Sequence, residues 1–154
     1  MNKYLQQFVE GKFQKPGKSL DLGAGDFEDV NFLKNNGWQS DGVDLTGGID
    51  LKQKFIAKNH PYDLVYSNYV IHKILNQKIF IETIFNNLKK DGFVFLHTFE
   101  ATDKNSHSTL TEKSLYDLLS KQKFKKIKIQ IIPYYDAADG HDHWHKILEA
   151  TAQK

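Results

Sequence analysis

The stretch from Lys18 to Asp44 constrains the fold more than any other part of the 154-residue chain. The run 19–22 is short and apolar, which is typical of a strand, and Gly23-Ala24-Gly25 breaks it at once. Helical spacing follows over residues 27–35, and a second strand closes just before Asp44. A strand, glycine turn, helix and strand, with an acid about 20 residues after the glycines, predict a parallel α/β unit that binds a ribose-containing ligand.

Two kinds of cofactor fit this unit, and its acidic residues favour one of them. A dinucleotide fingerprint, G-x-G-x-x-G, would need a glycine where this chain has Glu28, and an acid is unfavourable beside a pyrophosphate. Asp21, close before the glycines, is better explained by a cationic ligand. Asp44, at the tip of the second strand, can accept hydrogen bonds from two ribose hydroxyls.

The run Leu20-Asp21-Leu22-Gly23-Ala24-Gly25 resembles motif I of class I S-adenosylmethionine (SAM) dependent methyltransferases, whose acid-x-Gly-x-Gly loop receives a sulfonium amino acid. The chain departs from that family at Phe27, where a third glycine is common. The resemblance implies SAM as cofactor and S-adenosylhomocysteine (SAH) as product. The residues it assigns to cofactor contacts in this first part of the chain are Asp21, Leu22, Gly23, Ala24, Gly25, Asp44 and Leu45.

A second motif lies further along the chain, where residues 62–68 form an alternating, β-prone run that continues to Ile74. It resembles motif IV of small-molecule methyltransferases, in which Ser67 and Asn68 would lie beside the methionine part of SAM. It lacks the Asn/Asp-Pro-Pro-aromatic string of methyltransferases that act on adenine or glutamine amino groups. The joint 87–92 resembles the family's Leu-Lys-Pro-Gly-Gly turn before its fifth strand.

The remaining periodicity predicts one α/β domain over residues 1–154. Helices are expected over 3–13, 77–88 and 111–121, and strands over 93–96, 127–131 and 144–152. Helical connections imply parallel neighbours, and the last short connection implies an antiparallel hairpin. The resemblance implies a Rossmann-like, doubly wound, mostly parallel sheet of order 3-2-1-4-5-7-6, with the ligand outside the ends of strands one and four.

Two segments have open alternatives. Residues 49–51 are expected to be a vestigial third strand, and there the resemblance places Asp50 and Leu51 against adenine; an ordinary solvated turn acid is the alternative for Asp50. The amphipathic segment 3–13 is expected to pack against the sheet, and the alternative is a lid over the ligand.

Methyl transfer needs a general base only when the acceptor carries a proton. His72 follows the fourth expected strand and His97 ends the fifth, so both are candidate bases, and hydrogen-bonded packing histidines are the alternative. The aromatic residues that could line an apolar acceptor pocket are Tyr69, Phe99, Tyr134 and Tyr135.

The segment His141-Asp142-His143-Trp144-His145 suggests a metal site, because three histidines alternate along it. A same-face spacing of about 7 Å along a strand is wide for three ligands on one ion. We therefore predict no metal and place His143 on the acceptor side as a third candidate catalytic residue.

Bulk properties limit the partners. The chain has no cysteine, no signal-peptide core and no apolar run long enough to cross a bilayer, so we expect a cytoplasmic protein without membrane contact. Its net charge is +2 and every basic residue is a lysine, which disfavours nucleic-acid recognition. The prediction is SAM-dependent methyl transfer to a small molecule. A non-catalytic SAM-binding or partner-binding module and a nicotinamide-binding fragment are the alternatives, and the acceptor and oligomeric state are not readable.

Overall fold

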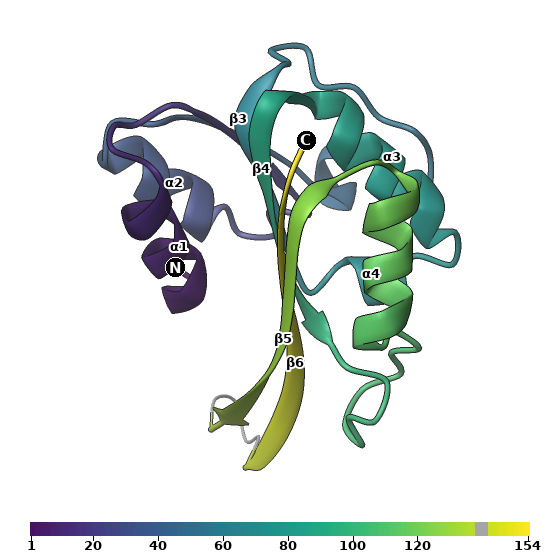
Figure 1. Cartoon of the computed structure of the whole chain (residues 1–154). Helices are drawn as coiled ribbons and strands as arrows, with labels where there is room; N and C mark the ends of the chain where they lie inside the picture. The colour runs from purple at the N-terminus through teal and green to yellow at the C-terminus, as the bar shows by residue number, and fades with distance from the viewer. Residues whose placement is uncertain (138–141) are drawn as a thin grey trace.

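The computed structural model describes residues 1–137 and 142–154 (Figure 1). His141 therefore lies outside the described residues. The elements in chain order are α1 (Lys3–Lys12), β1 (Lys18–Leu22), α2 (Glu28–Asn35), β2 (Gln39–Val43), the 3-10 helix η1 (Leu45–Gly47), β3 (Tyr62–Asn68), the 3-10 helix η2 (Ile71–Lys73), α3 (Gln77–Asn87), β4 (Leu88–Phe99), α4 (Glu112–Lys121), β5 (Lys125–Asp136) and β6 (His143–Gln153).

The strands form one sheet of order β2-β1-β3-β4-β6-β5. The pairs from β2 to β4 are parallel, and β6 is antiparallel to both β4 and β5. This is the expected order with its third strand missing, since β3, β4, β6 and β5 take the places of strands four, five, seven and six. The predicted Rossmann-like fold class is confirmed.

One expectation about the sheet is wrong, because residues 49–51 form turn and loop and not a vestigial strand. The backbone of this region bonds to side chains of α3 instead of to a neighbouring strand. Asn87 accepts from the Ala57 N–H at 2.8 Å and donates to the Phe55 carbonyl at 2.9 Å. Leu51 is buried in the core beneath this loop.

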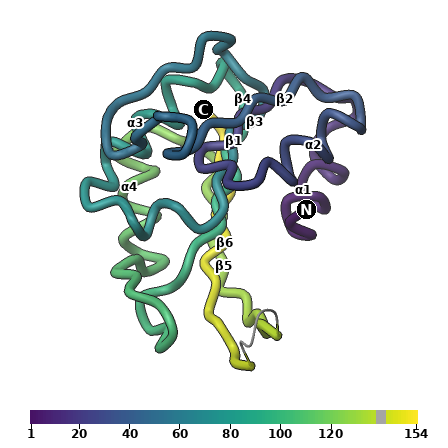
Figure 2. The backbone as a smooth tube through the Cα atoms, turned by 180° about the vertical axis from the view of Figure 1, so that it is seen from behind, coloured from purple at the N-terminus to yellow at the C-terminus, as the bar shows by residue number. Residues whose placement is uncertain are grey.

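Helices cover both faces of the sheet: α1 and α2 lie on one side and α3 and α4 on the other (Figure 1), as the reverse view in Figure 2 also shows. β4 illustrates why, because its side chains alternate between two apolar clusters. Val94 and Leu96 belong to the larger cluster, which includes side chains of α3 and α4, whereas Phe95 belongs to the cluster that contains Leu5 and Val9 of α1. The predicted packing role of the N-terminal helix is thus observed.

The hairpin of β5 and β6 extends beyond the helices at the end of the sheet where β4 finishes (Figures 1 and 2). Because β6 is antiparallel to β4, its first residues lie beyond the carboxyl end of β4, as the Phe99 to Ile147 pairing shows. The hairpin therefore carries His143 and His145 to the sheet edge where α/β proteins bind ligands. No helix among the described residues is both long and apolar enough to span a bilayer.

Candidate cofactor and substrate site

A cleft of about 540 Å³ opens at the carboxyl ends of β1 and β3. It lies where the chain order reverses on either side of β1, which is the position expected for a ligand in such a sheet. Its lining comes from the start of the chain, the glycine turn, α2, the end of β3 and one residue of β5, namely Met1, Asn2, Lys3, Tyr4, Asp21, Gly23, Ala24, Asp26, Glu28, Asp29, Asn68, Tyr69 and Tyr134.

The glycine turn is held by the end of β2. The N–H groups of Gly23 and Ala24 both donate to the Val43 carbonyl, at 2.8 and 3.0 Å. Gly23 has a φ of 95°, and a Cβ built there would lie 2.2 Å from Cγ2 of Val70. The turn thus needs glycine at this position for both its backbone conformation and its close approach to Val70.

We expect Gly23→Ala to lower the free energy of unfolding by about 1–3 kcal/mol, the usual cost of a strained backbone position. Urea denaturation would measure the change. Gly11→Ala is the matched control, since Gly11 lies inside α1 and a Cβ added there would meet nothing within 4 Å, so it should be neutral or stabilising by about 0.5–1 kcal/mol. Equal stability of Gly23→Ala and the wild type would show that the turn tolerates a side chain.

Phe27 explains how the chain manages without the third glycine. It precedes α2 with a φ of 64°, in the left-handed region that glycine adopts most readily. Its ring packs over Gly42 of β2, where an added Cβ would lie 2.9 Å from Phe27 Cε1. The backbone of the turn therefore keeps a left-handed residue at the position where motif I commonly has glycine.

Asp21 gives the cleft its electrostatic character. It is 3% exposed, and Oδ1 makes no hydrogen bond within the part of the chain that the structure describes. Burial, with help from the negative charges of Asp29 and Asp44, raises the pKa of Asp21 well above its ordinary value. A buried carboxylate with an unused oxygen at the base of an acidic cleft suits a cationic ligand.

Asp44 lies beside the turn, as the sequence predicts. It caps η1 by accepting from the N–H of Thr46 at 3.1 Å, and its other oxygen accepts from the N–H of Gly25 at 3.2 Å. Backbone hydrogen bonds, that of Thr46 first, lower the pKa of Asp44, so it is ionised at neutral pH. It can therefore present acceptor oxygens to hydroxyl groups next to the glycines.

The start of α1 covers the cleft from the other side. The Asn2 side chain accepts from the N–H groups of Tyr4 and Leu5, and so begins the helix. Its amide nitrogen donates to Asn68 Oδ1 at 3.0 Å and lies 3.2 Å from His97 Nδ1. The N-terminal segment therefore both packs on the sheet and lines the cleft.

A family model described as a methyltransferase domain matches residues 1–146. The chain belongs to this family. This confirms the superfamily that motif I indicated, the class I SAM-dependent methyltransferases, and with it the predicted enzyme class. No curated protein sequence matches the chain.

Solved structures of other methyltransferases have the same fold as this chain. A 1,6-didemethyltoxoflavin-N1-methyltransferase from Burkholderia thailandensis, with 1,6-didemethyltoxoflavin and SAH bound, aligns over 99% of this chain and 77% of its own, with 17% identity and a TM-score of 0.75. A SAM-dependent methyltransferase from Archaeoglobus fulgidus aligns over 99% and 92%, with 12% identity and a TM-score of 0.73. Phosphoethanolamine N-methyltransferase 2 from Haemonchus contortus, in complex with SAM, aligns over 99% and 52%, with 15% identity and a TM-score of 0.77.

The methyltransferase does not expose every residue that the motifs suggested for the cofactor. Leu22 and Ser67 are buried, and the Ser67 hydroxyl donates to the Leu22 carbonyl at 2.6 Å, which ties β3 to β1 beneath the turn. Beyond Asp44, Leu45 is 67% exposed. Asp50 is exposed and accepts from the N–H of Lys52, while Leu51 points into the core. Asp21, Gly23, Ala24 and Asn68 are the predicted cofactor residues that line the cleft itself.

Of the two candidate bases next to the central strands, His97 is buried and His72 is half-buried. His97 is 1% exposed beneath Asn2, with Nε2 3.3 Å from Glu149. His72 is half-buried on η2, and its Nδ1 lies 3.1 Å from the Thr98 hydroxyl. Burial lowers the pKa of His72 to about 4, so it is neutral at pH 7. Neither histidine lines the cleft, which favours the packing alternative for both.

The aromatic residues have separate positions. Tyr69 and Tyr134 line the cleft, and Phe99 packs against Tyr69 with ring centroids 5.1 Å apart. Tyr135 is on the outer side of the hairpin, where it packs against exposed Trp144. The predicted acceptor pocket therefore has three of its four aromatic residues at or next to the cleft.

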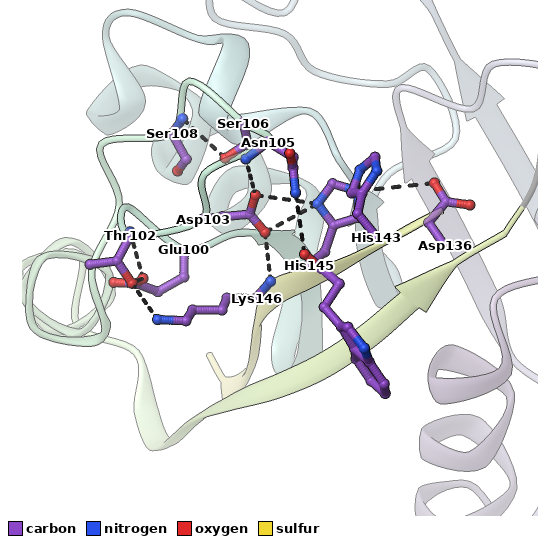
Figure 3. Close-up of polar contacts among 11 residues, drawn as sticks. Glu100, Thr102, Asp103, Asn105, Ser106, Ser108, Asp136, His143, His145 and Lys146 are labelled. Carbon is purple, nitrogen blue, oxygen red and sulfur yellow. Dashed lines mark hydrogen bonds and ion pairs between the residues drawn. The ribbon is translucent and has the colours of Figure 1, made fainter. Parts of the chain in front are cut away.

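On the hairpin, His143 and His145 come together with Asp136 of β5 and with Asp103 from the loop after β4 (Figure 3). Their Nε2 atoms are 3.0 Å apart, and His145 Nδ1 lies 3.1 Å from Asp103 Oδ2. Asp136 Oδ2 is 4.0 Å from His145 Nε2. Within the described ranges 1–137 and 142–154, no group of three or more ligand-type side chains is arranged for a metal ion.

Sequence patterns missed three residues of this region. Asn2 had a usable signal, because an asparagine directly before an amphipathic run is a typical helix cap. Asp29 is on the first turn of α2, where it accepts from the side chain of Asn68 at 2.7 Å, and an acid there reads as an ordinary helix-start residue. Asp103 follows β4 in a polar loop, and nothing near it in sequence indicates a histidine partner 42 residues away.

Proposed function

We propose that this methyltransferase binds SAM over the glycine turn and transfers its methyl group to a small-molecule acceptor held between α1 and the β5–β6 hairpin. The observation that carries the proposal is Asp21, a buried acid with an unused oxygen at the base of a cleft formed by a motif I turn. SAM supplies an electrophilic methyl group on a positively charged sulfur.

The residues present fit the cationic end of SAM. The acids that line the cleft with Asp21 are Asp26, Glu28 and Asp29, whereas Lys3 is the basic side chain among the lining residues. Asp21 stabilises positive charge there, with Gly23, Ala24 and Gly25 offering bare backbone and Asn68 a polar side chain. Leu22 and Ser67 support the turn from beneath it.

The adenosine end is assigned to the residues after β2. Asp44 accepts hydrogen bonds from the ribose hydroxyls, and Leu45, exposed next to it, covers the adenine. Asp50 is assigned to the adenine amino group, with Leu51 packing beneath that loop. These assignments extend the cofactor along the carboxyl ends of β1 and β2.

The proposed acceptor site is the part of the cleft that the cofactor assignments leave unoccupied. Tyr69 follows β3 with a φ of 59° and donates its N–H to the His97 carbonyl, which holds its backbone beside the cleft. Tyr4 and Tyr134 face the same space from α1 and β5. These rings hold a small, partly aromatic acceptor in line with the methyl group and exclude water.

The test is a methyl-transfer screen of the full chain with SAM, in which SAH formation is measured for catechol, thiophenol and benzimidazole as hydroxyl, thiol and ring-nitrogen probes. We expect SAH to form with at least one probe and to stay at background without an acceptor. SAM binding without turnover of any probe would contradict the enzymatic proposal and favour a SAM-binding module.

A further inference from the structure

Three tyrosines from separate elements line the acceptor part of the cleft: Tyr4 of α1, Tyr69 after β3 and Tyr134 of β5. We propose that these rings and the acids of the cleft hold an acceptor nitrogen that is uncharged before methylation and positively charged after it. The acceptor is then an arylamine or an unprotonated ring nitrogen, and not a hydroxyl or a thiol. This inference rests on the proposed function and narrows its acceptor class.

The three rings are placed to contact one ligand. Each tyrosine is half-buried at the cleft. Burial, and next the neighbouring Tyr134 and Tyr4, raise the pKa of Tyr69, so the three side chains lie near one another. The face of a tyrosine ring attracts a cation, and Lys3 Nζ already lies 5.0 Å from the centroid of the Tyr4 ring. The cleft thus offers ring faces to a positively charged group.

The charge of the lining favours a cation in addition to the cofactor. Its basic groups are Lys3 and the amino group of Met1, and its acids, which outnumber them by two, are Asp21, Asp26, Glu28 and Asp29. The buried, unused oxygen of Asp21 is a site for positive charge at the base of the cleft. SAM brings a single net positive charge, so the acids remain in excess when it is bound.

Methyl transfer to a neutral nitrogen keeps that positive charge in the cleft. The nitrogen lone pair forms the bond to the methyl carbon as the carbon–sulfur bond breaks with its electron pair on sulfur. Sulfur becomes neutral and nitrogen becomes a cation, so this step moves no proton. Transfer to an oxyanion or a thiolate would instead bring a negative charge in among like charges, which is unfavourable.

Among the described residues that line the cleft, there is no histidine to ionise a hydroxyl or a thiol. The candidate bases His72, His97 and His143 all lie outside that lining. Carboxylates are present, but their ordinary pKa of about 4 is far below the value of about 10 for a phenol. The raised pKa of Tyr69 keeps its hydroxyl protonated as well. A neutral nitrogen needs no base, since its lone pair is already free.

The first experiment measures binding to the SAH complex of the full chain and needs no turnover. 3-Hydroxyphenyltrimethylammonium mimics a methylated arylamine, and 3-tert-butylphenol has the same shape with a carbon in place of the charged nitrogen. Calorimetric titration should show about tenfold or more tighter binding of the cation, as expected for partly desolvated ring faces. Equal or tighter binding of the neutral phenol would overturn the proposal.

A ring variant tests the tyrosines. Tyr134→Leu should weaken binding of the cation about tenfold and change binding of the neutral phenol less, a difference that general damage to the site would not produce. Tyr116→Leu is the matched control, because Tyr116 is 50% exposed on α4, and it should change neither affinity. An equal loss of both affinities in Tyr134→Leu would reject the ring as a cation site.

Two charge variants should have effects of opposite sign. Asp26→Asn removes an acid but keeps an oxygen that can accept from the Glu28 N–H, and it should weaken binding of the cation about twofold to fivefold. Lys3→Gln removes the cation that lies over the Tyr4 ring and should strengthen binding. Neither variant should change binding of the neutral phenol. If both variants bind the cation like the wild type, the acids of the cleft do not select it and the proposal is overturned.

The second experiment adds N,N-dimethylaniline to the methyl-transfer screen. This amine and benzimidazole both have an unprotonated nitrogen near pH 7, so we expect SAH from at least one of them, with catechol and thiophenol at background. Methylation of catechol or thiophenol in preference to both nitrogen compounds would overturn the inference and leave the proposed function standing. If no probe is methylated, the enzymatic proposal fails, and the titration alone decides whether the cleft selects a cation.

Discussion

Asp21→Asn is expected to make the protein more stable and, at the same time, to weaken its binding of SAM. Asp21 is buried with an unused oxygen, and a buried polar group without a partner costs about 1–3 kcal/mol. Asn keeps a polar group at this position but removes the buried charge, whose desolvation raises the pKa of Asp21, so the free energy of unfolding should rise. The same change removes the negative charge that the cationic cofactor requires, so SAM affinity should fall about tenfold or more, which corresponds to about 1.4 kcal/mol.

The stability difference between Asp21→Asn and the wild type should change with pH in a known direction, which a packing effect would not do. Because the pKa of Asp21 is raised on folding, its stabilising contribution is complete below the ordinary carboxyl pKa of about 3.9 and is lost as pH rises through the raised value. The stability advantage of Asp21→Asn should therefore be larger at pH 8 than near pH 4. Thermal unfolding at both pH values would measure it, and a variant less stable than wild type at pH 8 would contradict the account.

Asp44→Ala is expected to weaken SAH binding by about 1.5–3 kcal/mol, the range for hydrogen bonds to a charged group. Asp44 is proposed to hold the ribose, and its carboxylate is ionised and adjacent to the glycine turn. Calorimetric titration would measure the change.

Two controls separate ribose binding from damage to the turn. Asp44→Asn keeps one of the two oxygens, which can accept from the N–H of Gly25 or from that of Thr46, so it should retain part of the support of the turn and recover only part of the affinity. Asp117→Ala removes an exposed acid on α4 that pairs with Lys113, and it should bind SAH like the wild type. Wild-type affinity in Asp44→Ala would reject the ribose assignment.

Local patterns in the sequence predict the fold well where one face or both faces of an element are buried. The run 62–68 matches β3 at both ends, and Thr111 caps α4 as its position suggests. The prediction of a strand over 49–51 is wrong. It is based on the alternation of Ile49 and Leu51, which is typical of a strand. Their apolar side chains instead pack on the core beneath a loop whose backbone bonds to Asn87, and a contact over that sequence distance leaves no local pattern.

The candidate site is predictable where chemistry and position coincide in one short motif. Asp21, the glycines and Asp44 are brought together as expected, because β1 and β2 are parallel neighbours that end at the same edge. The histidines are harder to place, since a strand position gives the edge of the sheet but not the partner. His97 is buried under Asn2, a residue 95 positions away, and the Asp103 partner of His145 comes from another loop.

The central claim is that the glycine turn binds SAM, and calorimetric titration of the wild-type chain with SAH tests it most directly. We predict saturable binding of one SAH per chain, which Asp44→Ala weakens and Asp117→Ala leaves unchanged. If the protein in the calorimeter is folded and neither SAH nor SAM gives a binding isotherm, the proposed SAM site at the glycine turn is contradicted.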